Sequence, residues 1–411
     1  MNLNKLLIAL AASGFVSTAF ATNGDVLIGL GAQSRAMGGT GTAAFFGSEN
    51  ALTNPALIAK SKGTEFSLGG TFFMPDVTAS STVAGAPASK KSDSDLSMIP
   101  EVSLTTRIND NLTFGLGMFG SAGMGVDYRG TAGLFDGYTN LQLMKFAPTL
   151  AYNRDNYGVG FAPVLQYGSL DINYTDPTGV NRGSGASSDL AWGFNLGGYY
   201  DVSPALTLGL AYQSPIKMKY DRQITTAAGG FGLAGFTDNL EQPAEIKVGA
   251  AYTLGSLMFT GDYKRIKWSS ADGYKDFNWK DQDVFALGMK YTTKGYWVGV
   301  GYNHGKDPIE VLPSEQTMVG YSNQAINMFN NHFFPGIVED HFTVGGGFAL
   351  GQNTSIDMAL VYADEVNKTI NTGTISSLVG AANPAALPVN ATTHTTTHSQ
   401  LGITVAVRMN F

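Results

Sequence analysis

The chain has 411 residues, of which only 14% are charged and 52 are glycine, and its formal net charge is −7. So low a charged fraction argues against an ordinary soluble protein, because soluble domains carry about 25% charged residues. A mean hydropathy of +0.00 excludes a bundle of membrane-spanning helices, and the acidic balance disfavours nucleic acid as a partner.

The first 21 residues predict a secretory signal peptide. Lys5 precedes an apolar stretch from Leu6 to Val16, and small residues at Ala19 and Ala21 favour cleavage after Ala21. About eleven apolar residues are too few for a spanning helix. The absence of Cys suits a chain that crosses an oxidising compartment. We therefore expect the mature chain to begin at Thr22.

Residues 22–63 lack the alternation of a spanning strand and are rich in Gly and other small residues between positions 38 and 44. A disordered tail is the alternative, but this segment holds several large apolar residues, which such tails lack. These are Val26, Leu27, Ile28, Leu30, Phe45 and Phe46. We expect residues 22–63 to fold inside the structure made by the rest of the chain, as a hatch.

The remainder, residues 64–411, alternates between apolar and polar positions in fourteen segments bounded by turn residues. Most of them reach the roughly 9 to 11 residues with which a tilted strand crosses a bilayer. The segments are Thr64–Met74, Ile99–Arg107, Leu112–Gly120, Leu141–Asn153, Tyr157–Tyr174, Asp189–Val202, Leu206–Lys217, Ala244–Leu254, Leu257–Trp268, Asp283–Thr292, Tyr296–His304, Asp340–Leu350, Thr354–Val366 and Ser399–Phe411.

The connections between these segments alternate in length. Tight turns such as Gly255-Ser256 and Lys294-Gly295 alternate with long connections such as 305–339 and 367–398. A large soluble β-sandwich, the alternative, would not sort its connections in this way. Short periplasmic turns and long extracellular loops are typical of outer-membrane barrels. The pattern predicts an all-β transmembrane barrel of 14 antiparallel strands, with both termini on the periplasmic side.

The last segment shows the alternation most clearly. Every second residue from Leu401 to Phe411 is apolar, and the residues between them are small or polar, so that one face suits lipid. The chain ends at Phe411, as barrels inserted by the outer-membrane assembly machinery do. We expect that machinery, outer-membrane lipid and lipopolysaccharide to be partners.

Two motifs resemble the FadL, TodX and OmpP1 family of outer-membrane transporters. They are Gly31-Ala32-Gln33-Ser34-Arg35-Ala36-Met37-Gly38-Gly39 and the triplet Asn54, Pro55 and Ala56. The resemblance implies a monomeric barrel with an N-terminal hatch. It also implies capture of long-chain fatty acids or hydrocarbons on extracellular loops, passage through a pocket beside the hatch, and lateral exit through the wall without an energy source or cofactor.

Candidate site residues follow from this resemblance. Val26, Leu27, Ile28 and Leu30 are expected to line the ligand pocket, although a role in the core of the hatch is equally open, and the Asn54-Pro55-Ala56 triplet is expected to brace the hatch. Phe231, Leu233 and Phe236 are candidates for the capture groove. Gly115, Gly117 and Gly120 are candidates for the lateral opening, since glycine marks bends in strands. Tyr167 replaces an Arg that fatty-acid transporters have in the fifth strand, which favours an uncharged ligand.

Other functions have weaker support in the sequence. A general porin would need a charged, open lumen, and an adhesin-like structural barrel rests only on the long loops. No nucleophile motif supports an enzyme, and only Asp340 with His341 would merit inspection as part of a catalytic group. His394 and His398 are expected in a solvated loop, so that no metal site is expected.

Overall fold

The computed structural model describes residues 22–83, 87–176, 178–380 and 387–411. Fourteen antiparallel strands of this described part form a closed ring in which β19 pairs with β3, so the predicted barrel is confirmed. In ring order these are β3 (Thr64–Ser81), β5 (Ser97–Arg107), β6 (Leu112–Asp127), β7 (Tyr138–Arg154), β8 (Tyr157–Asn173), β9 (Ser187–Asp201), β10 (Leu206–Gln213), β13 (Glu245–Leu254), β14 (Leu257–Ile266), β15 (Gln282–Thr292), β16 (Tyr296–Gly305), β17 (Asp340–Ala349), β18 (Thr354–Asn371) and β19 (Thr393–Asn410).

Side chains alternate between the outside and the inside of this ring because successive residues of a strand point to opposite faces. In β10, Leu208 and Leu210 are 45% and 57% exposed, whereas Ala211 and Gln213, on the other face of the strand, are buried. The same holds for β19, where Ile403 and Val405 lie on the exposed face and Thr404 is buried. The exposed face is therefore apolar and suits lipid.

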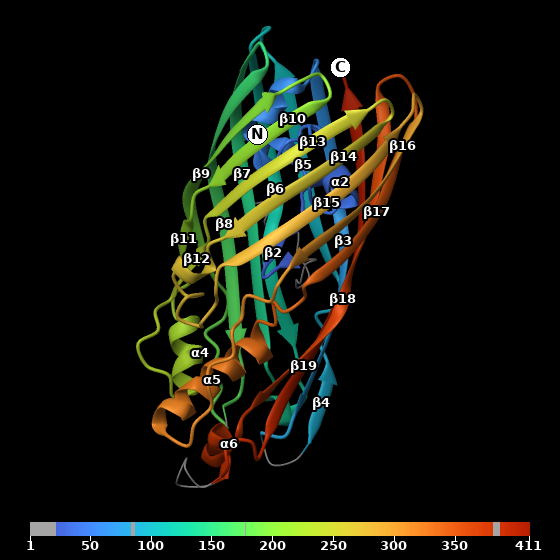
Figure 1. The fold of residues 1–411 in the computed structure, drawn as a ribbon. Coiled ribbons are helices and arrows are strands. Elements are labelled where there is room, and N and C mark those ends of the chain that lie inside the picture. Colours follow the sequence, from blue (N-terminus) through green and yellow to red (C-terminus); the bar gives the residue numbers. More distant parts are fainter. Residues whose placement is uncertain (1–21, 84–86, 177, 381–386) are drawn as a thin grey trace.

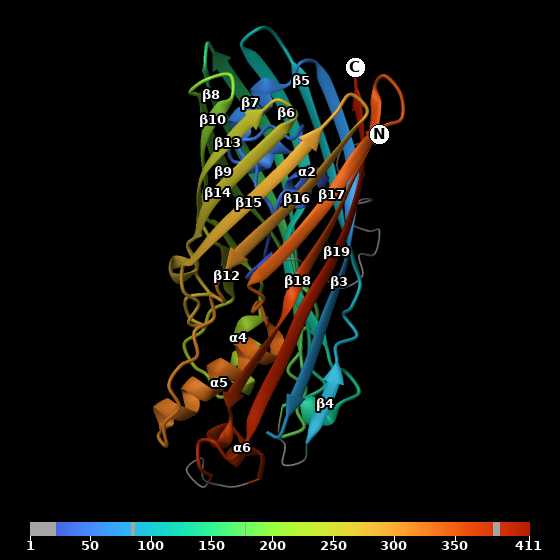
Figure 2. The same cartoon turned by 45° about the vertical axis from the view of Figure 1, so that its right-hand side comes forward.

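The two ends of the barrel differ. The short turns and the C-terminus gather at one end, and the long connections with their helices gather at the other (Figures 1 and 2). The long connections contain β4 (Ala88–Lys91), η2 (Ala132–Leu134), β11 (Ile216–Lys219), α4 (Ile224–Gly230), β12 (Asn239–Gln242), η3 (Trp268–Ser270), α5 (Met318–Phe333) and α6 (Gly373–Gly380). In the part of the chain that the structure describes, no helix is long and apolar enough to cross a membrane.

The strands β3, β18 and β19 are longer than the sequence suggested. They extend toward the helical end of the molecule, where β19 begins at Thr393. The prediction that His394 and His398 lie in a solvated loop is therefore wrong: both side chains are buried, at 0% and 4% exposure. Helix α5 contacts β18 and β19 at this end and shields the two histidines from solvent.

Residues 22–60 form β1 (Thr22–Asn23), β2 (Val26–Leu27), α2 (Gly31–Ala36), α3 (Asn50–Thr53) and η1 (Pro55–Lys60). Helix α2 contacts β16 to β19, whereas η1 contacts β6 to β9, on the opposite side of the ring. The ribbon of this N-terminal segment overlaps the barrel in both views (Figures 1 and 2). Its two halves are thus attached to opposite walls.

Candidate functional site

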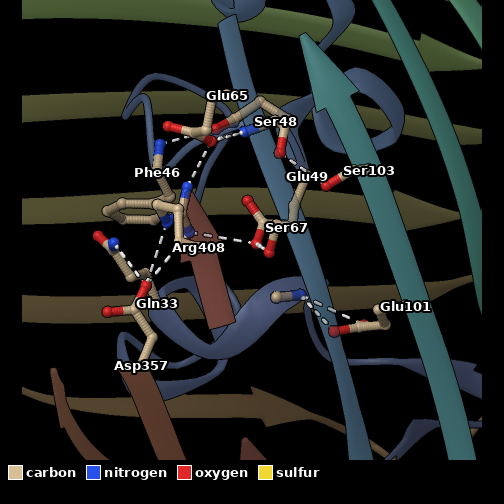
Figure 3. A network of polar contacts seen from close by, with 12 residues as sticks. Gln33, Phe46, Ser48, Glu49, Glu65, Ser67, Glu101, Ser103, Asp357 and Arg408 are labelled. Carbon is tan, nitrogen blue, oxygen red and sulfur yellow. Dashed lines mark hydrogen bonds and ion pairs between the residues drawn. The ribbon is translucent and has the colours of Figure 1, made fainter. Parts of the chain in front are cut away.

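A buried ionic cluster joins the N-terminal segment to the seam of the barrel (Figure 3). The Arg408 guanidinium of β19 lies 3.1 Å from the Glu49 carboxylate of the N-terminal segment, 2.6 Å from Glu65 of β3 and 3.3 Å from Asp357 of β18. A second buried ion pair joins the N-terminal segment to the wall: the Arg35 guanidinium of α2 lies 2.6 Å from the Glu101 carboxylate of β5. Because these charges are buried, each carboxylate depends on its guanidinium for compensation.

The Asn54, Pro55 and Ala56 triplet contacts the opposite wall. The Asn54 side chain accepts a hydrogen bond from the Ala56 N–H, which caps η1, and donates to the carbonyl groups of Thr42 and of Gly198 in β9. A Cβ atom on Gly197 would come within 2.0 Å of the Asn54 side-chain oxygen. Glycine at this position therefore allows the close approach of η1 to β9.

A lumenal cavity of about 60 Å³ lies between the N-terminal segment and the wall. Val26, Leu27, Ile28 and Leu30 all contribute to its lining, as does Leu52 of α3. The four residues that the sequence analysis chose for a ligand pocket are thus brought together around one cavity. Their contact with a ligand stays a prediction.

The wall of this cavity is charged, unlike its N-terminal side. Lys145, Lys247 and Lys264 line it together with Glu245 and Asp262. Both acidic groups are already engaged. Glu245 lies 3.0 Å from the Lys247 ammonium, and Asp262 accepts hydrogen bonds from the backbone N–H groups of Gly41 and Thr42 at 2.9 Å each. The lining therefore holds one more positive than negative formal charge.

The hydrogen-bonded wall of the barrel is interrupted beside this cavity. The pairing of β5 with β6 ends at Glu101 and Phe119, although β6 continues to Asp127 and stays paired with β7. Pro100, which precedes Glu101 in β5, has no backbone N–H and so cannot donate a hydrogen bond to β6. On β6 the register shifts between Gly120 and Ala122, and Ser121 at this bulge also lines the cavity.

The N-terminal segment occupies part of the edge that this interruption leaves. Val26 of β2 pairs with Ala122 of β6, and the Gly123 N–H donates a hydrogen bond of 3.1 Å to the Asp25 carbonyl. The buried Asp25 carboxylate in turn accepts hydrogen bonds from Tyr274 and Gln242, which belong to the helical end of the molecule. Asp25 thus links the break in the wall to the long connections.

Two of the three glycines predicted for a lateral opening lie away from this interruption, and the opening itself stays a prediction. Gly115 and Gly117 are within the continuous part of the β5 and β6 ladder. A Cβ on Gly115 would come within 2.7 Å of Ile58 in η1, so this glycine makes room for the N-terminal segment. Only Gly120 borders the interruption.

Tyr167 lies on the outward face of β8 and is 42% exposed, so its side chain does not face the lumen. The neighbouring Gln166 is the inward residue and is fully buried. Neighbouring residues of a strand point to opposite faces, so Tyr167 faces outward and Gln166 faces the lumen. The argument from Tyr167 for an uncharged ligand is therefore not supported.

Phe231, Leu233 and Phe236 do not form an open groove in this structure. Phe231 and Leu233 are buried, and the Phe231 ring lies 5.2 Å from that of Tyr174 and 5.9 Å from that of Phe329 in α5. Phe236 is partly buried against Phe277. A second, smaller cavity of about 20 Å³ lies in the same region, but none of the three residues lines it.

Sequence reasoning missed the charged and polar residues of the site. Lys145, Gln166 and Arg408 all occupy inward positions of their strands. A signal was available, because a Lys or Arg on the face opposite the apolar positions is conspicuous in a chain with so few charges. The strand alternation alone could not show which charges are paired.

These features define a class of protein. A closed barrel of antiparallel strands with an apolar outer face has the architecture of an outer-membrane barrel. The family model described as "Outer membrane protein transport protein (OMPP1/FadL/TodX)" matches residues 8–311. The chain therefore belongs to this family.

Individual relatives agree with this assignment. The long-chain fatty acid transport protein of Escherichia coli O6:H1 is 26% identical over 323 residues, which cover 64% of this chain and 72% of the relative. Outer membrane protein P1 of Haemophilus influenzae is 23% identical over 365 residues, covering 75% and 79%. The crystal structure of a Pseudomonas aeruginosa FadL homologue shares the fold with a TM-score of 0.70 at 15% identity, covering 94% of this chain and 100% of that one. The Pseudomonas putida toluene transporter TodX does so with a TM-score of 0.67 at 18% identity, covering 93% and 99%.

Proposed function

We propose that this protein takes up hydrophobic small molecules, long-chain fatty acids or hydrocarbons, passively across the outer membrane. Membership in the transport family supports this function, as do the relatives whose names specify long-chain fatty acids and toluene. The single observation that carries the proposal is the position of the cavity: apolar residues of the N-terminal segment line it, and so does Ser121 at the break between β5 and β6.

In this proposal residues 22–63 are a hatch that blocks the lumen, residues 64–411 are the barrel, and the short turns and the C-terminus face the periplasm. The expected periplasmic position of Thr22 is not supported, because the neighbouring Asn23 is bonded to Asn303 near the helical end of β16. A cavity of about 60 Å³ holds only about two water molecules at their liquid volume, so a long-chain ligand requires the apolar hatch residues 26–30 to move. The ionic contacts of Arg408 and Arg35 hold the later part of the hatch in place meanwhile. Movement is thus expected in residues 22–30 rather than in the whole hatch.

The ligand leaves sideways in this proposal, between β5 and β6 past Gly120 and Ser121. Lateral exit keeps an apolar molecule away from water throughout, and each buried CH₂ is worth about 0.8 kcal/mol. Downhill partition into the membrane therefore suffices, and no energy source is needed. The protein acts as a monomer in contact with outer-membrane lipid and lipopolysaccharide, after insertion by the assembly machinery through its Phe411 end.

Uptake of labelled palmitate and toluene by cells with and without the gene tests the function, together with single-channel conductance of the purified protein. We expect gene-dependent uptake and a small conductance. A large, steady conductance without gene-dependent uptake would instead support a general porin, and the absence of both would support a structural or adhesin-like barrel.

A further inference from the structure

The N-terminal segment begins with a short hairpin, β1 and β2, whose two-residue turn is Gly24 and Asp25. The turn lies against two indole rings, since a Cβ atom on Gly24 would come within 2.8 Å of Trp268 and 2.9 Å of Trp279. Gly24 also has a φ of +66°, a left-handed conformation that favours glycine. Glycine at this turn therefore lets the hairpin fit between the two rings.

Both rings belong to residues 267–281, the connection between β14 and β15 at the helical end of the molecule. Trp268, Tyr274 and Trp279 of this connection pack on one another, with ring centroids 4.6 to 5.0 Å apart, and all three are buried. Trp279 also donates a hydrogen bond of 3.1 Å to Asn330 of α5. These three rings form an aromatic cage around the turn of the hairpin.

Asp25 joins the aromatic cage to the break in the wall. Its buried carboxylate accepts hydrogen bonds from the Tyr274 hydroxyl and, at 3.1 Å, from the Gln242 amide. Its backbone carbonyl accepts one from Gly123 of β6, beside the residue pair that attaches β2 to this strand. The other carboxylate oxygen has no hydrogen-bond partner among the described residues. The attachment of Asp25 to the long connections therefore depends on Tyr274 and Gln242.

The aromatic cage borders an empty space. Tyr274 and Trp279 line the second cavity, of about 20 Å³, and so does Met124 of β6. Protein interiors are close-packed, so a ring that borders a cavity can shift with fewer clashes than a ring packed on all sides. The cavity is thus shared by the cage and by the strand to which β2 is attached.

We propose that residues 267–281 are a latch on the lateral opening, in which Tyr274 is the positioning residue that holds the N-terminal hairpin against β6 through Asp25. While the Tyr274 hydroxyl is bonded to Asp25, β2 covers the edge of β6 at the break. Once this bond opens, β2 can leave that edge. The opening is thereby controlled by a connection that reaches the surface of the molecule, where Lys275 and Lys280 are exposed. This inference rests on the proposed function for what passes through the opening.

Cysteine labelling of the purified protein tests the latch, because the chain has no Cys of its own. The reporter is Ala122→Cys, at a position that pairs with Val26 and is 1% exposed, and the probe is a maleimide. Tyr274→Phe removes only the hydroxyl that holds Asp25. We expect the reporter to be labelled at least about 10-fold faster in this variant, because a hydrogen bond to a carboxylate is lost from the closed state.

Tyr321→Phe is the matched control. The Tyr321 hydroxyl of α5 is also buried, but it donates to the Phe231 carbonyl and not to the N-terminal segment, so the reporter should be labelled at the wild-type rate. A second reporter, Ala325→Cys in α5, is fully buried at the same end of the molecule and should be labelled no faster in Tyr274→Phe. It separates release of the hairpin from a general loosening of the long connections.

Equal labelling of Ala122→Cys with and without the Tyr274 hydroxyl would overturn the latch, and so would an increase of the same size at both reporters. If Tyr274→Phe does not assemble, Gln242→Leu removes the other bond to Asp25 and should speed the labelling of Ala122→Cys in the same way. No ligand enters this experiment, so its result is independent of the uptake measurements that test the proposed function.

Discussion

Arg408 is the residue on which the buried charges of the seam depend, since its guanidinium lies within 3.3 Å of three carboxylates. In Arg408→Met these carboxylates lose their counter-ion, which for a buried pair costs about 3 to 5 kcal/mol. We expect a correspondingly lower unfolding free energy in urea, followed by the gel mobility of folded and unfolded barrel. Arg154→Met is the matched control, because Arg154 is largely exposed. Equal stability of the two variants would show that the cluster is not needed.

Gln166 and Tyr167 offer a test of which face of β8 meets the lumen. Gln166→Leu removes a buried amide without partners, so we expect a barrel about 1 to 3 kcal/mol more stable in urea. Tyr167→Leu changes only the lipid-facing surface, so its unfolding free energy should stay within about 0.5 kcal/mol of the wild type. The reverse result would contradict the observed register.

The same pair of residues shows what sequence could and could not predict about the site. Val26, Leu27, Ile28 and Leu30 were chosen because the family resemblance implies a pocket beside the N-terminal segment, and these are large apolar residues of that segment. The polar half of the site was not predicted: Tyr167 was the residue of β8 expected to face the ligand, but it lies on the outward face, and the inward residue beside it is Gln166. Pairing between distant residues such as Lys145 and Gln166 depends on strand register, which alternation within one strand does not fix.

Strand β2 closes part of the break in the wall, and a disulfide can test whether it must move. Val26 and Ala122 are opposite each other in the register, and the chain has no Cys, so Val26→Cys with Ala122→Cys can form one defined bridge. We expect palmitate uptake to fall at least about 10-fold when the bridge is oxidised, and to return on reduction, because a covalent link prevents the shift of residues 22–30.

A control bridge distinguishes gating from a general effect of oxidation. Thr369→Cys with Thr395→Cys joins β18 to β19 far along the same sheet, between residues that are also opposite each other. Its oxidation should leave uptake unchanged. If the bridge between positions 26 and 122 also left uptake unchanged, exit of the ligand would not require β2 to move.

The strands themselves were predictable because two independent signals agreed on each of them, alternation within the segment and turn residues at its ends. The outer halves of β18 and β19 escaped prediction because both faces there are polar and rich in Thr, so alternation disappears. Their burial comes from α5, which packs against them from a long connection. The packing of α5 on these strands depends on the tertiary structure, and the sequence near His394 does not predict it.

For the molecule as a whole, the helical end should lose stability in acid. Burial lowers the pKa of His332 in α5 to about 3, from an ordinary value of 6.5. Between pH 3 and pH 6.5 the His332 side chain is protonated in the unfolded chain but neutral in the folded protein. The contribution of His332 to stability is therefore complete above pH 6.5 and declines by about 1.4 kcal/mol for each pH unit below it, or about 2 kcal/mol at pH 5.

Thermal unfolding followed by Trp fluorescence at pH 7 and pH 5 measures this effect. The wild type should unfold at a lower temperature at pH 5, and His332→Phe, which keeps an aromatic ring but cannot titrate, should lose less on acidification. Ser322→Ala, a change on the same helix that removes no titratable group, should keep the wild-type response. A pH response of His332→Phe equal to that of the wild type would rule out this histidine as the cause.

The location of Arg408 implies an order of events during biogenesis. Its three acidic partners come from the hatch, from the first strand of the ring and from the last but one, whereas Arg408 itself lies three residues before the end of the chain. The ion cluster can therefore assemble only once the final strand has been made and has joined the first. Closure of the ring thus precedes completion of this link between the N-terminal segment and the seam, whereas the contacts of η1 with β6 to β9 need no residue of β19.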